Sequence, residues 1–154
     1  RAFWDGIVVM AGGMADGHAV AAAQALGCDL AYMGTKFIAT RESLAKDGYK
    51  QMLVSSRLDD VLLTRAFTGL KTNMLRPSIA AAGLDPDNLP VRGKIDISKD
   101  INAAERERPD AKRWKDIWSA GHSVSGVADL PTVAELIERT AGEYRAARRS
   151  VQSV

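Results

Sequence analysis

Two glycine-containing turns carry the residue types best suited to chemistry in this sequence. Gly12-Gly13 follow the apolar run Ile7–Met10, and Gly34-Thr35 follow the apolar run Leu30–Met33. Glycine lets the backbone approach a bound group closely and turn its N–H donors toward it. One Gly-Gly pair is typical of a tight turn. A second such loop, at the spacing of a neighbouring strand, favours a phosphate site that needs no basic side chain.

The segments around these turns predict one parallel βαβ unit. Both apolar runs are too short for helices and are expected to be buried strands. Between them, Gly17–Leu26 predicts a helix, with Asp16 as its N-cap and Gly27 at C′. Strand, helix and strand within about thirty residues is the size of one βαβ unit. Both turns then lie at the carboxyl ends of parallel strands, where α/β folds bind ligands, and the helix adds the positive end of its dipole.

Further sequence blocks extend this pattern along most of the chain. In order, they are Ala11–Gly17, Ala21–Ala23, Leu26–Asp29, Tyr32–Thr40, Arg41–Ser43, Leu63–Gly69 and Asp116–Gly121. In their order and spacing these blocks resemble the nitronate monooxygenase family, the former 2-nitropropane dioxygenases. The resemblance implies a TIM barrel, bound FMN, and oxidation of alkyl nitronates by O2 to carbonyl compounds and nitrite.

The resemblance covers the C-terminal part of such an enzyme, from about the seventh strand onward. The chain has 154 residues, whereas a (β/α)8 barrel typically takes about 250. The expected fold is therefore α/β. Residues 1–40 would form the last βαβ unit of the barrel, 41–128 an appended, mostly helical region over the active-site face, and 129–154 a C-terminal helix. The chain opens at Arg1 without an initiator methionine, and we expect a fragment with no useful turnover.

The resemblance also indicates which residues bind the cofactor. Backbone N–H groups of both loops are expected to hold the FMN phosphate, with Thr35 Oγ1 as an additional donor. The predicted cofactor-binding residues are Gly12, Gly13, Tyr32, Met33, Gly34 and Thr35. The catalytic histidine of the family belongs to a glycine-rich segment that this chain lacks, so no catalytic residue is assigned. The expected partners are an alkyl nitronate and O2, together with a homo-oligomer.

Other functions remain open at this point. Enoyl-acyl-carrier-protein reductases and NADH:quinone reductases are flavin barrels with similar phosphate loops, and substrate profiling would separate them. A non-catalytic module that binds FMN or another phosphate is a different class, which defined binding stoichiometry would identify. A structural remnant without a ligand would unfold with poor cooperativity.

Composition restricts the partners further. The formal net charge of +2 does not indicate strong nucleic-acid binding. No apolar run approaches the roughly 20 residues of a membrane span. The single cysteine, Cys28, fits a cytoplasmic protein and is expected to be a buried small residue. The two histidines lie far apart in the sequence and predict no metal site.

The histidines depart from the family pattern. His122 stands where the family usually has glutamine after Ala-Gly. If this loop lines the flavin pocket, His122 would bring a titratable donor or acceptor to it; the alternative is an exposed, inert imidazole. His18 falls where arginine is common and is expected to face solvent near the phosphate end.

The remaining segments predict scaffold. Tyr49–Ser56 has helical character, and Val61–Thr68 is expected to be a strand that places Leu63, Arg65 and Phe67 on one face. Further expected elements are a short helix Pro77–Ala82 capped by Gly83, a weakly patterned stretch Val91–Pro109, a helix Lys112–Trp118 pairing Trp114 with Trp118, and a C-terminal helix whose apolar stripe holds Val133, Leu136, Ile137, Thr140 and Tyr144.

Overall fold

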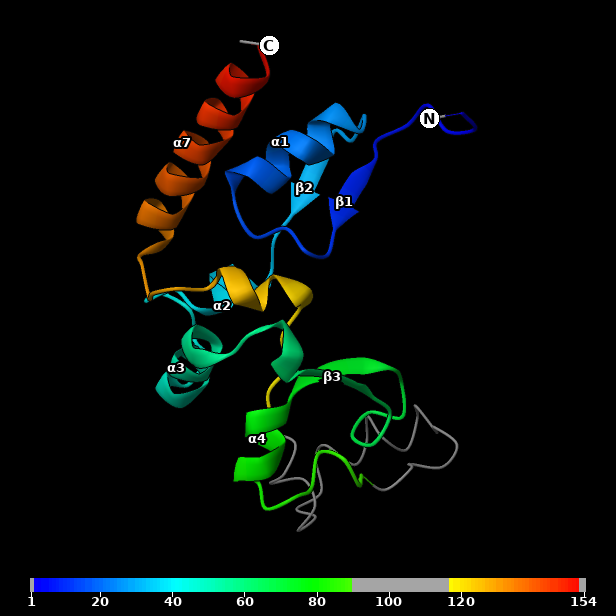
Figure 1. Cartoon of the computed structure of the whole chain (residues 1–154), viewed down its shortest axis with the longest axis vertical. Helices are drawn as coiled ribbons and strands as arrows, with labels where there is room; N and C mark the ends of the chain where they lie inside the picture. The colour runs from blue at the N-terminus through cyan, green and yellow to red at the C-terminus, as the bar shows by residue number, and fades with distance from the viewer. Residues whose placement is uncertain (1, 90–116, 153–154) are drawn as a thin grey trace. The chain divides into compact units, whose positions relative to one another are not determined.

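The computed structural model describes residues 2–89 and 117–152 (Figure 1). These residues form two compact units. The first contains residues 2–55 and 121–152, and the second contains the described residues 56–89 and 117–120. Residues 41–55 and 121–128 thus belong to the same unit as the predicted βαβ segment. The functional division into 1–40, 41–128 and 129–154 stays a prediction.

The first unit begins with the predicted βαβ arrangement. Strand β1 (Val9–Ala11) pairs in parallel with β2 (Leu30–Tyr32), and helix α1 (Gly17–Ala25) connects them (Figure 1). Asp16 is confirmed as the N-cap of α1, because its Oδ1 accepts the Ala19 N–H at 2.8 Å. Leu26 is the C-cap of the helix, and Gly27 follows at φ +87°. Compared with the predicted runs, β1 begins two residues later and ends one residue later, whereas β2 begins at the predicted residue and ends one residue earlier.

One face of this two-stranded sheet is apolar and open to solvent within the described residues. The register pairs Val9 with Leu30 and Ala11 with Tyr32, so their side chains share one face. Val9, Leu30 and Tyr32 are 50%, 56% and 67% exposed. Parallel sheets normally have both faces covered. The open apolar face is therefore a surface that another structural layer would bury.

The rest of the first unit is helical. It contains α2 (Thr35–Ile38), α3 (Asp47–Ser55), the 3-10 helix η2 (His122–Gly126) and α7 (Val133–Gln152). The predicted helix near Tyr49 is confirmed as α3. Ala23, Ala39, Leu53, Val124 and Leu136 are buried in this unit. Helix α7 contacts α1, and η2 contacts α2 and α3, so segments far apart in the sequence lie together in this unit.

Helix α7 packs along α1 (Figure 1). Gly17, the first residue of α1, is buried, and a Cβ there would overlap the Thr140 carbonyl oxygen and the Tyr144 amide nitrogen. The predicted C-terminal helix is confirmed, but its stripe is only partly buried. Leu136 is 1% exposed, whereas Ile137 is 54% exposed. The two helices meet over a narrow strip because a glycine lets their backbones come close.

The second unit contains a β-hairpin that the sequence did not reveal in full. After the short 3-10 helix η1 (Leu58–Asp60), β3 (Val61–Thr64) pairs antiparallel with β4 (Thr72–Leu75), and α4 (Arg76–Ala81) follows. The predicted strand Val61–Thr68 was wrong beyond Thr64. Thr64 Oγ1 accepts the Ala66 N–H at 3.1 Å, which turns the chain. Arg65 and Phe67 therefore do not continue the strand face of Leu63.

The region 41–128 thus mixes helices with this hairpin. The predicted helix around Pro77 is confirmed as α4, with Gly83 at φ +79° beyond its end. Trp118 is not helical, because its carbonyl accepts the Leu75 N–H at 2.8 Å and Ser119 bridges to Met74. Val91–Pro109, the first part of the predicted helix Lys112–Trp118, and Trp114 lie outside the described residues.

A small core holds the second unit together. Met74, Ile79 and Ile117 are buried, and Leu62 and Phe67 pack against them. Ser78 is fully buried; its hydroxyl donates to the Leu75 carbonyl and accepts the Trp118 N–H at 2.9 Å. In the described ranges, no helix has the length and hydropathy needed to cross a membrane.

Candidate functional site

The two glycine-containing loops lie at the same edge of the β1–β2 sheet. The strands run parallel, and Ala11 is level with Tyr32. The residues that follow them, Gly12 and Met33, therefore leave the sheet at its carboxyl edge together. This is the edge at which α/β folds bind ligands. The predicted proximity of the two loops is confirmed for the backbone.

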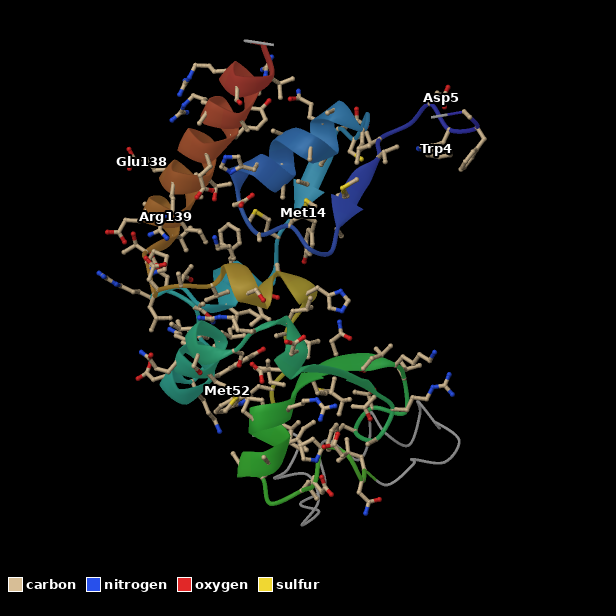
Figure 2. The ribbon with its side chains drawn as sticks, in the orientation of Figure 1. Trp4, Asp5, Met14, Met52, Glu138 and Arg139 are labelled. Atoms are coloured by element: carbon tan, nitrogen blue, oxygen red, sulfur yellow. The ribbon has the colours of Figure 1, made fainter. Side chains whose placement is uncertain are left out.

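Gly12 and Gly13 have a conformation that other residues rarely adopt. Their φ angles are +86° and +68°, in the left-handed region. A Cβ added at either position would meet no atom within 4 Å. Glycine is therefore required at these two positions by the backbone conformation and not by packing. The surface above the loop is open. Met14, labelled in Figure 2, comes directly after the pair.

Gly34 ends the second loop, and Thr35 is the first residue of α2. A Cβ at Gly34 would also meet nothing within 4 Å, and its φ of −113° is ordinary, so this glycine leaves room without a conformational requirement. Thr35 is buried, and its Oγ1 accepts the Gly121 N–H at 2.9 Å. The hydroxyl predicted as a phosphate donor thus already has an internal role as an acceptor, and it keeps one proton to donate.

The side chains of Tyr32 and Met33 point to different surroundings. Tyr32 is 67% exposed on the open face of the sheet. Met33 lines an apolar pocket of about 290 Å³ together with Val20, Phe37 and Tyr144. The two side chains do not converge, so what Tyr32 and Met33 bring to the sheet edge is their backbone.

The start of α1 differs from the prediction. Two carboxylates already accept first-turn N–H groups: Asp16 accepts from Ala19, and Glu143 Oε2 of α7 accepts from Gly17 at 2.8 Å. These negative charges use the positive end of the helix that was expected to attract a phosphate. A phosphate at this edge would therefore rely on the N–H groups of the loops. Sequence reasoning missed Glu143, since nothing local links it to a residue 126 positions away.

The end of η2 is a second feature that sequence reasoning missed. A Cβ at Gly126 would lie 2.8 Å from the Cβ of Ala15, in the loop after the first two glycines. Gly121, just before η2, donates to Thr35 in the other loop. The small residues of Gly121–Gly126 were the only signal available in the sequence.

Neither histidine lies in an enclosed environment. His122, the first residue of η2, is exposed. His18 is 62% exposed, with Nδ1 3.8 Å from Asp16 Oδ2, so its predicted solvent exposure is confirmed. Cys28 is only partly buried. Across residues 2–89 and 117–152, no three or more His, Cys, Asp or Glu side chains gather closely enough to hold a metal ion.

An ion pair anchors the start of α7. Arg139 donates to both carboxylate oxygens of Asp129, at 3.0 and 2.7 Å, and this hydrogen bonding lowers the pKa of Asp129. The charge of Lys36, next to Thr35, lowers it slightly further. Backbone hydrogen bonding from Thr132 lowers the pKa of Glu135. Arg139 is labelled in Figure 2 on α7.

Comparison with known proteins places this chain in a family. The family model described as nitronate monooxygenase matches residues 7–142. A nitronate monooxygenase of Paraburkholderia phytofirmans is 31% identical over 144 residues, which cover 90% of this chain and 38% of that protein.

Two solved structures are similar in fold and sequence. Nitroalkane oxidase from Streptomyces ansochromogenes matches with a TM-score of 0.70 and 30% identity, over 96% of this chain and 42% of that one. A FabK variant from Thermotoga maritima matches with a TM-score of 0.70 and 25% identity, over 97% of this chain and 45% of that one. The chain thus spans less than half the length of each of these three proteins, and it belongs to the nitronate monooxygenase family of oxidoreductases.

Proposed function

We propose that this chain is the C-terminal part of an FMN-dependent nitronate monooxygenase and that its two strand-end loops bind the FMN phosphate. The observation that carries the proposal is the pair Gly12-Gly13. Both residues are in the left-handed region, with open space above them, beside the end of the neighbouring parallel strand. Backbone N–H groups arranged in this way are suited to an anion.

The loops fit a phosphate group sterically. An added Cβ would meet nothing within 4 Å at Gly12, Gly13 or Gly34, so a bound group has room at all three positions. Thr35 Oγ1 accepts the Gly121 N–H and retains a proton that it can donate. The residues present therefore suit the phosphate of FMN, and we assign Gly12, Gly13, Gly34 and Thr35 to it, with the backbone of Tyr32 and Met33.

The open face of the β1–β2 sheet supports the barrel assignment. Val9, Leu30 and Tyr32 expose apolar surface that parallel sheets normally bury on both sides. Relatives and similar structures are more than twice as long as this chain. We propose that β1 and β2 are the last two strands of a (β/α)8 barrel and that preceding strands cover this face.

The chemistry that FMN supplies when bound is two-electron oxidation of the nitronate, with O2 as the final acceptor. The residues of this chain bind and orient the phosphate end of the cofactor, and we assign no proton transfer to them. We therefore expect no turnover by the chain itself. A cytoplasmic location and assembly into a homo-oligomer belong to this proposal.

The test compares binding of FMN and riboflavin, which differ only in the phosphate. We expect the chain to bind FMN more tightly, and Gly13→Ala to weaken FMN binding by about tenfold. The left-handed region costs an L-residue about 1–2 kcal/mol, so we expect the free loop of the variant to adopt another conformation, which FMN binding would have to reverse. Gly142→Ala, at an open position in α7, is the control. Equal affinities for FMN and riboflavin would exclude the phosphate site. Nitrite formation from a nitronate measures turnover.

The similarity to FabK favours a second candidate, a flavin-dependent reductase. Enoyl-acyl-carrier-protein reductases and NADH:quinone reductases would share the phosphate site proposed for this chain. Consumption of NADH with an enoyl thioester or a quinone, measured on the full-length protein, separates them from a nitronate oxidase. FMN binding at one-to-one stoichiometry without any of these activities would indicate a non-catalytic module.

A further inference from the structure

One segment contacts both candidate phosphate loops. This segment, Gly121–Gly126, contains the 3-10 helix η2 and lies in the same compact unit as the loops. At its start, the Gly121 N–H donates to Thr35 Oγ1 at 2.9 Å. At its end, Gly126 packs against Ala15, which follows the two left-handed glycines. The segment therefore spans from one loop to the other.

The contact at Gly126 leaves no room for a side chain. A Cβ there would lie 2.8 Å from Ala15 Cβ and 3.6 Å from both Cα and the carbonyl oxygen of Ala15. Alanine has no side-chain torsion, so its Cβ moves only if the backbone moves. A methyl group at Gly126 would consequently displace the Gly12–Asp16 loop.

The contact at Thr35 is also rigid. Thr35 is 6% exposed, and Ser123 and Val124 of the segment are buried. The Val124 N–H donates to the Gly121 carbonyl at 3.0 Å, which closes the turn that carries the donor to Thr35. An added Cβ at Gly121 would lie 3.1 Å from Thr35 Oγ1, so the backbone approaches the hydroxyl closely.

We propose that Gly121–Gly126 fixes the separation of the two loops, and that Gly121 and Gly126 are positioning residues for the phosphate of the cofactor. The proposal rests on the proposed function, because it assigns these residues to the same phosphate site. It adds that the site is built from three segments of the chain. Small errors in the placement of binding groups strongly reduce binding and catalysis, so a shift of one loop against the other has a large effect.

The first experiment uses a steric substitution and its relief. Gly126→Ala is expected to weaken FMN binding about tenfold, while riboflavin affinity changes less than about twofold. Adding Ala15→Gly removes the opposing methyl group, and the double variant is expected to regain FMN affinity. Loss of stability alone would weaken both ligands equally. Gly142→Ala, which meets nothing within 4 Å, serves as the matched control and should retain wild-type binding.

The second experiment tests the contact at Gly121. Gly121→Ala keeps the Thr35 hydroxyl but places a Cβ 3.1 Å from its Oγ1. We expect Gly121→Ala to reduce the preference for FMN over riboflavin and Gly142→Ala to retain it.

The outcomes distinguish failure of the proposed phosphate site from failure of the proposed positioning role. A wild-type chain without preference for FMN would refute the proposed function and this inference together. A wild-type preference that survives in both Gly126→Ala and Gly121→Ala would refute only the inference. A reduced preference in Gly126→Ala that Ala15→Gly does not restore would also contradict the steric argument.

Discussion

Replacing Gly17 by alanine tests whether the close approach of α1 and α7 holds the first unit together. Helix propensity predicts stabilisation, because alanine is favoured over glycine by up to about 1 kcal/mol inside a helix. The structure predicts the opposite. A Cβ at Gly17 would overlap backbone atoms of Thr140 and Tyr144 and lie 2.7 Å from Glu143 Cβ. Backbone atoms within a helix cannot move aside independently of one another.

The magnitude combines two losses. Overpacking costs about 1–3 kcal/mol, and separating the helices breaks the bond from the Gly17 N–H to Glu143, worth about 1.5–3 kcal/mol for a charged acceptor. After the gain in helix propensity, we expect a net loss of about 1.5–5 kcal/mol. For a chain of this size, that lowers the unfolding temperature by roughly 3–20 °C.

The assay is thermal unfolding followed by far-ultraviolet circular dichroism. Gly142→Ala is the matched control, since this glycine also lies in a helix but an added Cβ would meet nothing within 4 Å. We expect this control to equal or exceed the wild type in stability. A Gly17→Ala variant as stable as Gly142→Ala would refute the inferred contact between the helices.

Three further predictions concern stability. Leu136 is 1% exposed, and Leu136→Ala should lower the free energy of unfolding in urea by about 2–5 kcal/mol. Ile137 is 54% exposed, and Ile137→Ala should lower it by less than about 1 kcal/mol. Similar losses for the two variants would contradict the assigned packing face of α7. Asp129→Asn should destabilise the chain at pH 7 by less than about 1 kcal/mol, because its ion pair with Arg139 is partly exposed. Since folding lowers the pKa of Asp129, this difference should shrink as the pH falls from about 4 through the lowered pKa, and a constant difference would contradict it. Ser78→Ala should lower the free energy of unfolding by about 1–3 kcal/mol, because the Trp118 N–H loses this acceptor. Urea unfolding followed by tryptophan fluorescence measures this loss, and an unchanged unfolding midpoint would contradict the role of the Ser78 hydroxyl.

The βαβ unit was predictable because its signals are local. Apolar runs ended by glycine located both strands. Asp16 marked the start of α1, because it caps the helix by a hydrogen bond to a residue only three positions away in the sequence. The same locality explains why Tyr49 and Pro77 indicated their helices correctly. Short-range capping and periodicity can be recognised in the sequence without knowledge of the tertiary contacts.

The hairpin and the hydrogen bonds that hold the candidate site in place join residues far apart in the sequence. Strand β4 forms because Thr72–Leu75 pairs with β3, and Trp118 is extended because its carbonyl accepts a bond from Leu75, 43 positions earlier in the sequence. The bonds from Gly121 to Thr35 and from Gly17 to Glu143 join residues 86 and 126 positions apart. One sequence locates the loops of the candidate site but cannot show what holds them in place.

The most direct test of the central claim is an amide NMR titration of the chain with FMN. Backbone N–H signals report where the phosphate binds, and glycine amides fall in a distinct region of the spectrum. We expect the largest shifts at Gly12, Gly13, Gly34 and Thr35, with riboflavin producing little change at these positions. Saturating FMN that leaves these four signals unchanged would contradict the claim that the two strand-end loops bind the phosphate.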